Sequence, residues 1–393
     1  MLPYTFLYSF TMNNVNITTL LPILFCFYVM GFVDLTGVSV SYVKNDFALS
    51  DTVANIIPMM VFLWFAILSI PLIGFMNRKG RKKTVLLSAI VTTISMLLPM
   101  FSYTYPVVLT SFALLGIGNT ILQVSLNPLL SDVSPASKLT SMLTLGQFIK
   151  AIASTLGPIL ISLASGLLGD WKYIFPVYAF LTGISWLWLM LKPIKETEIH
   201  EENISVLSLL KNPKIILFFS VIMLSVGFEI GLITTVPKYL QESFGMSIEQ
   251  GSYACSLYYI ARTIGTFVGS IFLIRISAIK YQVTSVLMGI IAFVIFLLSK
   301  NEWMVFVTLF LVGLLCANIF SVTLSTALQY KPDCANEVSS LMITGVSGGA
   351  IIPPIMGLVA DHWNQAVCLI VPLLALIYIL YASFKFKGKV SYS

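Results

Sequence analysis

Four ionisable side chains stand inside long apolar stretches of the 393-residue chain: Asp34, Lys150, Glu229 and Arg262. An ionised side chain near the centre of a bilayer costs roughly 2.5–3.5 kcal/mol on insertion scales, so such residues usually face a bundle interior or a wet cavity. A carboxyl group in that setting can exchange a proton, bind a cation or polar ligand, or form a fixed salt bridge. We predict the first or second role for Asp34 and Glu229, and a structural salt bridge is the alternative for each.

Lys150 has no acidic neighbour in the sequence, so its partner must come from another span, and Asp34 is the best candidate. Gln147 and Ser154 lie one helical turn on either side of Lys150 and extend a polar stripe, which favours a cavity-facing position. Three interpretations stay open: a switchable ion pair, a cation that receives an anionic ligand, and a lysine that snorkels to the membrane surface.

The second half of the chain offers a comparable but smaller polar set. Arg262 follows Tyr258 by four residues, so the two side chains share one helix face. Contact with a bound solute and a static pair with another helix are both open for Arg262. Asn318 is a weaker candidate for solute binding.

Three carboxamides follow one another at intervals of four residues: Asn119, Gln123 and Asn127. This spacing keeps them on one helix face over about 12 Å. Amides offer both donors and acceptors, and sugar hydroxyls require both. The row therefore predicts the lining of a sugar site, and hydrogen bonding between helices is the alternative.

The overall composition explains why these polar residues are conspicuous. The chain has 22 Lys and Arg, 16 Asp and Glu and 58% apolar residues, so about one residue in ten is charged where soluble domains have about one in four. This excludes a soluble enzyme, a disordered chain and a nucleic-acid binder. A span needs roughly 20 apolar residues, and twelve segments qualify: 20–42, 53–76, 84–101, 106–130, 139–168, 173–191, 215–240, 248–274, 283–298, 305–328, 338–360 and 367–384.

The spans fall into two sets of six. We predict an all-α membrane protein with an N-terminal six-helix bundle (1–191), a cytoplasmic linker (192–213) and a C-terminal six-helix bundle (214–393). A shift of 195 residues places Asp34 on Glu229, and it also aligns Gly74 with Gly269 and Pro158 with Pro353. A parallel repeat of two six-helix halves, with the substrate site between them, is a known transporter design.

Lys and Arg residues set the predicted orientation. If both termini are cytoplasmic, sixteen of the 22 basic residues lie in inside loops and four in outside loops, as the positive-inside rule requires. We therefore expect a multi-pass protein of the cell membrane, such as a bacterial inner membrane, with both termini in the cytoplasm.

A basic loop follows the second span, with the sequence Asn-Arg-Lys-Gly-Arg-Lys-Lys over residues 77–83. Together with the twelve spans and the repeat, it resembles the signature loop of the major facilitator superfamily. The resemblance implies the two-bundle fold of that superfamily, secondary transport and no enzymatic activity. Asn77 stands where the superfamily usually has Asp, so the usual helix-capping ion pair of the loop does not carry over.

A narrower resemblance links the chain to the fucose/glucose/galactose–proton symporter family. Its strongest motif is Gly-Gly-Ala-Ile-Ile-Pro-Pro at residues 348–354, followed by Met356-Gly357 and Ala360-Asp361. Weaker supporting motifs sample both halves of the chain: Asn127-Pro128, Val-Gly-Phe-Glu at 226–229 and Arg-Thr-Ile-Gly-Thr at 262–266. The resemblance implies a monosaccharide as substrate and a proton as coupling ion.

Two departures concern the coupling. The fucose symporter of that family has an acidic residue four positions before the Asn-Pro pair, where this chain has Gln123. It also has an Asp late in the first span, where this chain has Gly37. Asp34 lies three residues earlier, nearly one helical turn, and can present its carboxyl group on roughly the same face.

Span eleven is rich in residues that weaken a helix. Gly348 and Gly349 permit close helix approach, and Pro353 and Pro354 leave backbone carbonyls without donors. We predict a gating role for these four residues, although static packing explains them equally well.

These observations favour a secondary active transporter that imports a small polar solute, first of all a monosaccharide, by cation symport with alternating access. Asp34 and Glu229 would couple the cation, and nine residues would bind the solute: Asn119, Gln123, Asn127, Gln147, Lys150, Glu229, Tyr258, Arg262 and Asn318. The alternatives are a carrier of a sugar acid or other organic anion held by Lys150 and Arg262, and an uncoupled sugar facilitator. We expect no cofactor, no metal site and no nucleic-acid partner; the expected partners are the solute, the coupling cation and the lipid bilayer around a monomer.

Overall fold

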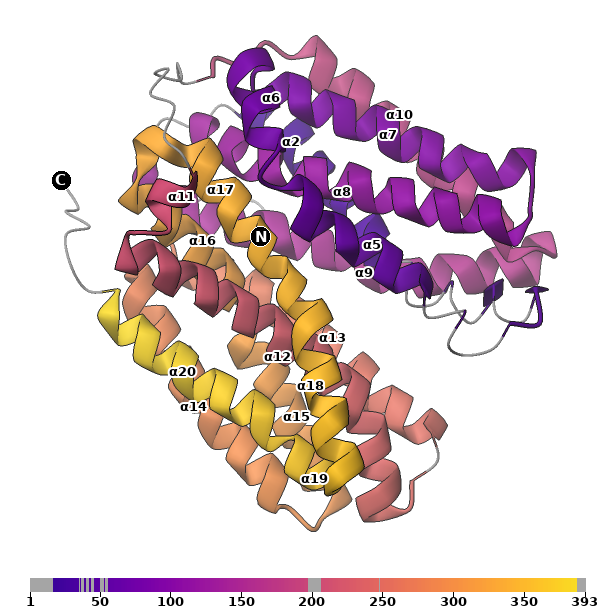
Figure 1. Ribbon diagram of the computed structural model, residues 1–393, viewed down its shortest axis with the longest axis vertical. Helices are drawn as coiled ribbons and strands as arrows, with labels where there is room; N and C mark the ends of the chain where they lie inside the picture. Colours follow the sequence, from indigo (N-terminus) through magenta and orange to yellow (C-terminus); the bar gives the residue numbers. More distant parts are fainter. Residues whose placement is uncertain are drawn as a thin grey trace, which may run out of the picture. The chain divides into compact units, whose positions relative to one another are not determined.

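A computed structural model describes residues 17–386 apart from 35, 37–38, 40–41, 44–45, 50–52, 54–55, 197–205 and 247 (Figure 1). The described residues form helices and turns without a β-strand. They divide into two compact units, residues 1–203 and 204–393, and the boundary falls inside the predicted linker 192–213.

The N-terminal unit consists of long helices joined by short turns. Its first helix, α2, changes to a 3₁₀ turn at Gly31, and its second span is split between α5 and α6. Its elements are α2 (Ile17–Met30), η1 (Gly31–Asp34), α5 (Ile56–Leu68), α6 (Leu72–Lys79), α7 (Arg81–Phe101), α8 (Tyr105–Val133), η2 (Ala136–Lys138), α9 (Leu139–Leu168), η3 (Trp171–Tyr173) and α10 (Ile174–Leu191).

The C-terminal unit also consists of long helices joined by short turns, and two of its spans are broken. Its elements are α11 (Val206–Leu209), α12 (Pro213–Phe244), α13 (Ile248–Phe272), α14 (Ala278–Leu298), α15 (Glu302–Cys316), α16 (Ile319–Tyr330), η4 (Pro332–Cys334), α17 (Ala335–Thr344), η5 (Gly345–Ser347), α18 (Gly348–His362), α19 (Gln365–Cys368) and α20 (Ile370–Lys385).

Each of the twelve predicted spans corresponds to a helix or to a broken helix. Nine segments of the described chain are long and apolar enough to cross a membrane, and a bent pair, Met59–Leu68 with Leu72–Lys79, would make a tenth. The remaining two predicted spans coincide with α9, of 30 residues, and α13, of 25 residues. Many large apolar side chains on these helices are exposed, as expected where lipid rather than water is the solvent.

Several predicted spans are interrupted rather than continuous. The axis bends by 62° between α5 and α6, where Pro71 precedes the first residue of α6. Proline lacks an N–H donor and its ring clashes with the preceding turn, so it is a common cause of such kinks. Span ten breaks at Asn318 between α15 and α16, and span eleven breaks at η5. Hydropathy alone does not detect such breaks, because an interrupted helix stays equally apolar.

Glycines bring particular helices into close contact within each unit. In the C-terminal unit α12 and α18 lie side by side (Figure 1). A Cβ atom on Gly348 would collide with the backbone carbonyl of Met223, and one on Gly227 would collide with Ile352. Small residues at such contacts let backbones approach and gain van der Waals packing in a lipid solvent.

Candidate functional site

Asp34 lies at the end of η1, against the middle of α9. Ser154 of α9 donates a short hydrogen bond to Oδ2 of Asp34, and the same hydroxyl also lies 3.0 Å from the carbonyl oxygen of Lys150. The backbone of Gly31 packs closely here, because a Cβ atom at this position would come within 2.6 Å of the Lys150 carbonyl. The α2–η1 segment therefore brings the Asp34 carboxylate onto the polar stripe of α9.

The expected ion pair between Asp34 and Lys150 is not formed in this structure. Among the described residues no carboxylate oxygen lies within 4 Å of the Lys150 ammonium group. The reason is register: Asp34 is level with Ser154, and Ser154 lies one helical turn, about 6 Å along the axis, beyond Lys150. Lys150 and Gln147, the other member of the stripe, are both half-buried.

The three carboxamides of α8 are buried and linked into a row. Gln123 Nε2 donates to Asn119 Oδ1 at 2.7 Å, and Asn127 Nδ2 donates to the Gln123 carbonyl at 2.6 Å. Asn119 Nδ2 donates to the carbonyl of Met30 at 2.8 Å. Met30 is the last residue of α2 and directly precedes the 3₁₀ turn η1. Asn119 thus secures the helix break that positions Asp34.

One hydrogen-bond acceptor in this row of carboxamides is unpaired among the described residues. Within the described chain, Oδ1 of Asn127 is buried and has no hydrogen-bond partner. Buried polar atoms are nearly always paired, so this oxygen is available for a hydroxyl or a water molecule.

In the C-terminal unit, Glu229 of α12 and Arg262 of α13 form an ion pair. Arg262 Nη1 lies 2.8 Å from Glu229 Oε1, and the two side chains are 26% and 17% exposed respectively. Tyr258, one turn before Arg262 on α13, is buried. The pair neutralises both charges in this structure and leaves each side chain partly accessible.

Asn318 fills the break between α15 and α16. Its Nδ2 atom donates to the carbonyl of Gly265 at 2.8 Å and to the Tyr281 hydroxyl at 2.9 Å. Both of its N–H groups are therefore used inside the unit, where they join α13, α14 and α16. These two bonds give Asn318 a packing role, while its Oδ1 atom is buried without a partner among the described residues, so solute binding by Asn318 stays a prediction.

The four residues predicted to gate lie at the start of α18 and within it. Gly349 faces the side chains of Ile230 and Val226 of α12. Pro353 and Pro354 remove the backbone donors that would reach the carbonyls of residues 349 and 350, one turn earlier. Together with the 3₁₀ turn η5 just before Gly348, they interrupt the regular α-helical hydrogen bonding of span eleven.

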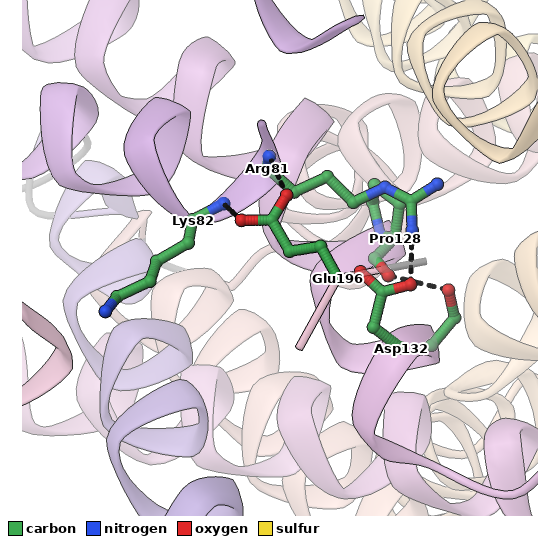
Figure 2. Close-up of polar contacts among 6 residues, drawn as sticks. Arg81, Lys82, Pro128, Asp132 and Glu196 are labelled. Atoms are coloured by element: carbon green, nitrogen blue, oxygen red, sulfur yellow. Dashed lines mark hydrogen bonds and ion pairs between the residues drawn. The ribbon is translucent and has the colours of Figure 1, made fainter. Parts of the chain in front are cut away.

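A second polar cluster lies where α6, α7, α8 and the end of α10 meet (Figure 2). The Arg81 guanidinium forms a buried ion pair with Asp132 near the end of α8. The Glu196 carboxylate accepts hydrogen bonds from the backbone N–H groups of Arg81, at 2.5 Å, and Lys82, at 3.0 Å. These are the first two residues of α7, so Glu196 caps that helix and lies favourably on its dipole.

The same cluster also pairs carbonyl groups at the C-terminal end of α10. Lys82 Nζ donates to the carbonyl oxygens of Met190, at 3.1 Å, and Lys192, at 2.7 Å. Gly80 has φ = 88°, a conformation that favours glycine, and a Cβ atom there would lie 2.8 Å from Glu196 Oε2. Gly80 thus makes room for the carboxylate.

At the opposite ends of α7 and α8, Asp46 joins two aromatic side chains. Its Oδ2 atom accepts from the Tyr103 hydroxyl at 2.6 Å and from Trp171 Nε1 at 2.9 Å. The Lys172 ammonium lies 4.2 Å from the centre of the Tyr103 ring. Burial, followed by the hydrogen bond and charge of Asp46, raises the pKa of Tyr103. Burial also tends to raise the pKa of Asp170, but hydrogen bonds and charge from Lys172 outweigh it and lower the pKa.

Comparison with known proteins identifies the family of this chain. The family model for the Major Facilitator Superfamily matches residues 20–352 and again residues 217–392. The chain belongs to the Major Facilitator Superfamily. Its members are transporters and not enzymes, as the sequence predicted, and the predicted class of membrane fold is confirmed.

Individual relatives agree with the narrower resemblance. The chain is 24% identical over 378 residues to a glucose/galactose transporter of Brucella abortus biovar 1 (strain 9-941), with 90% of each chain covered. It is 24% identical over 386 residues to a putative glucose/galactose transporter of Helicobacter pylori (strain J99 / ATCC 700824), covering 91% of this chain and 94% of the relative. The crystal structure of the superfamily transporter FucP in the outward conformation superposes with a TM-score of 0.83 at 16% identity, covering 95% of this chain and 99% of FucP.

Two residues of this Major Facilitator Superfamily chain escaped sequence analysis, Asp132 and Glu196. Asp132 lies just past the end of span four, where an acidic residue looks like part of a loop. Glu196 is 115 positions from Arg81 in the sequence, so no local pattern connects the two.

Proposed function

We propose that this chain imports a monosaccharide, a neutral hexose first of all, across the cell membrane by proton-coupled symport with alternating access. Support for the substrate class comes from the transporters named for glucose and galactose that resemble it over about 90% of its length. The proposal includes cytoplasmic termini, bundles of residues 1–191 and 214–393, a linker of residues 192–213, and a monomeric carrier.

The observation that carries the coupling proposal is the pair of repeat-related carboxylates. Asp34 is exposed and hydrogen-bonded to Ser154, and Glu229 is partly exposed and paired with Arg262. An ionised carboxylate within a membrane-spanning helix costs free energy, so such residues usually have a function in the protein. We assign proton uptake and release to Asp34, and substrate hydrogen bonding with proton coupling to Glu229.

The carboxamide row supports a polyhydroxylated substrate. Asn119 and Asn127 bracket Gln123 on one face of α8, and the Asn127 carbonyl oxygen is an unused acceptor among the described residues. We propose that Gln123, Asn127, Gln147 and Tyr258 contribute to the sugar site, while the hydrogen bonds of Asn119 chiefly hold the end of α2. Gating by Gly348, Gly349, Pro353 and Pro354 completes the proposal.

Transport of a sugar acid is the second candidate, and Lys150 favours it. Its ammonium group has no carboxylate partner within 4 Å in the described part of the chain. Arg262 gives less support, because its charge is already neutralised by Glu229. Competition of labelled hexose uptake by neutral hexoses and by uronic or sialic acids separates the two candidates.

The coupling assignment is tested by Asp34→Asn in proteoliposomes. We expect the variant to lose uphill hexose accumulation driven by an inward proton gradient while it retains counterflow exchange, because exchange needs no net proton release. Ser154→Ala is the matched variant that keeps the carboxylate but removes its hydrogen bond, and it should retain accumulation. Accumulation by Asp34→Asn at the wild-type level would refute the assignment.

A further inference from the structure

An open groove runs along the outside of the C-terminal unit between α13 and α14. Its volume is about 320 Å³, and α15 contributes two leucines to its wall. Val268 and Phe272 of α13 face Thr284 and Met288 of α14 across it, and Lys280 stands at one end. Phe272, Thr284 and Met288 are exposed, so the groove is accessible from the surface of the unit.

Gly265 of α13 lies in the wall of the groove. A Cβ atom on Gly265 would collide with the carbonyl of Leu314, so α13 packs tightly on α15 at this level. Gly265 itself lines the groove, and the next groove residues on α13 are Val268 and Phe272. The stretch from Gly265 to Phe272 is about 10 Å long, roughly two-thirds of the 15 Å depth of one leaflet.

The two ends of the groove differ in chemistry. At one end Arg275 and Lys280 flank the turn between α13 and α14, and both are exposed. Within the described chain neither has a carboxylate oxygen within 4 Å. The N-terminus of α14 lies at this same end, and Ser277 makes no side-chain capping bond to it. Two cationic side chains and the backbone N–H groups at the start of α14 therefore lie at one end of the apolar groove.

This combination matches one class of ligand. The turn of Arg275 and Lys280 belongs to the predicted cytoplasmic loops, and anionic lipids give the cytoplasmic leaflet its negative surface potential. Basic pockets beside apolar grooves between helices suit a lipid phosphate with an attached acyl chain. A zwitterionic lipid would gain the apolar contact but little of the charge interaction.

We propose that this groove is a binding site for an anionic phospholipid of the cytoplasmic leaflet. The phosphate lies against Lys280 and Arg275 at the N-terminus of α14, and one acyl chain lies between Val268 and Met288. The groove includes neither Asp34 nor Glu229, and the proposal does not depend on the proposed sugar specificity.

The test is native mass spectrometry of the purified full-length protein with phosphatidylglycerol or phosphatidylethanolamine added in equal amounts. The wild-type protein should retain more phosphatidylglycerol than phosphatidylethanolamine. Lys280→Gln should weaken that retention about fivefold, the loss expected for one basic residue near the membrane surface. Lys300→Gln is the matched control, because Lys300 is also exposed and follows the opposite end of α14.

A groove-filling variant tests the acyl chain separately. Thr284 is exposed, so Thr284→Trp can occupy the groove without disturbing the core, and a thermal melt confirms that the variant is folded. We expect Thr284→Trp to reduce phosphatidylglycerol retention even though both cations remain. Equal retention of the two lipids by wild type, equal loss in Lys280→Gln and Lys300→Gln, or unchanged retention by Thr284→Trp would each overturn the proposal.

Discussion

Removal of the Glu229 charge while Arg262 stays in place should destabilise the C-terminal unit by about 2–3 kcal/mol. Loss of one partner from a fully buried ion pair costs roughly 3–5 kcal/mol, because the other charge is left uncompensated. Here the side chains are 26% and 17% exposed, so water screens the remaining charge and the cost falls to about 2–3 kcal/mol, at or below the bottom of that range. Glu229→Gln keeps the shape of the side chain and isolates the effect of charge.

The double variant Glu229→Gln/Arg262→Gln removes both charges and so leaves no unpaired cation. We expect it to recover about 1.5–2 kcal/mol of the loss, which is a coupling energy typical of residues in direct contact. Stability and transport should then separate: the double variant melts near wild type but does not accumulate hexose, since the carboxylate of Glu229 is absent.

The five cysteines, all in the described chain and none in a disulfide, provide the assay. Cys26, Cys316, Cys334 and Cys368 are buried, and Cys255 is partly buried. A thiol-reactive fluorophore will therefore report unfolding in detergent. For a unit of this size 2–3 kcal/mol corresponds to a fall of about 4–12 °C in Tm.

Two results would refute this reasoning. If Glu229→Gln and the double variant melt at the same reduced temperature, the ion pair does not couple the two side chains. If the double variant regains both stability and uphill accumulation, the pair is static packing and Glu229 has no part in transport.

Three further predictions follow from local geometry. Glu196→Gln should lower stability by about 1–2 kcal/mol in the same melt, because a neutral amide caps α7 more weakly than a carboxylate. Gly348→Ala should cost about 2 kcal/mol or more, since its Cβ collides with a backbone carbonyl of α12, whereas Gly357→Ala in the same helix has open space and should be neutral or slightly stabilising. The lowered pKa of Asp170 means that its stabilising contribution is present above the ordinary aspartate pKa and fades as pH falls through the lower folded value; Asp170→Asn should therefore melt with less acid sensitivity below about pH 4.

Each of these predictions has a control. Glu302→Gln removes an exposed acidic residue from the first turn of α15, and it should cost less than Glu196→Gln; equal effects would mean that capping by Glu196 is unimportant. Equal melting of the two glycine variants would contradict the close approach of α12 and α18. Identical acid sensitivity of Asp170→Asn and wild type, measured as Tm against pH, would show that the Lys172 contact has no effect.

The sequence was sufficient to locate the helices and the residues that stand out among them. Hydropathy is a local property, so each predicted span corresponds to a helix or a broken helix. Weakening of span eleven was predicted from its glycines and prolines, but the interruption at Asn318 was not, because it depends on contacts with other helices. Asn318, for example, is held at its break by Gly265 and Tyr281.

What the sequence determined by itself was the class of protein and the identity of four costly charges, because low charge density in an apolar chain makes each exception visible. Only the tertiary structure decided their partners. Arg262 forms an ion pair with Glu229, whereas Asp34 accepts a hydrogen bond from the Ser154 hydroxyl, one helical turn away from Lys150. Glu196 caps a helix that begins 115 residues earlier in the chain. These outcomes depend on the register between packed helices, where a shift of one turn, about 5.4 Å, exchanges one partner for another.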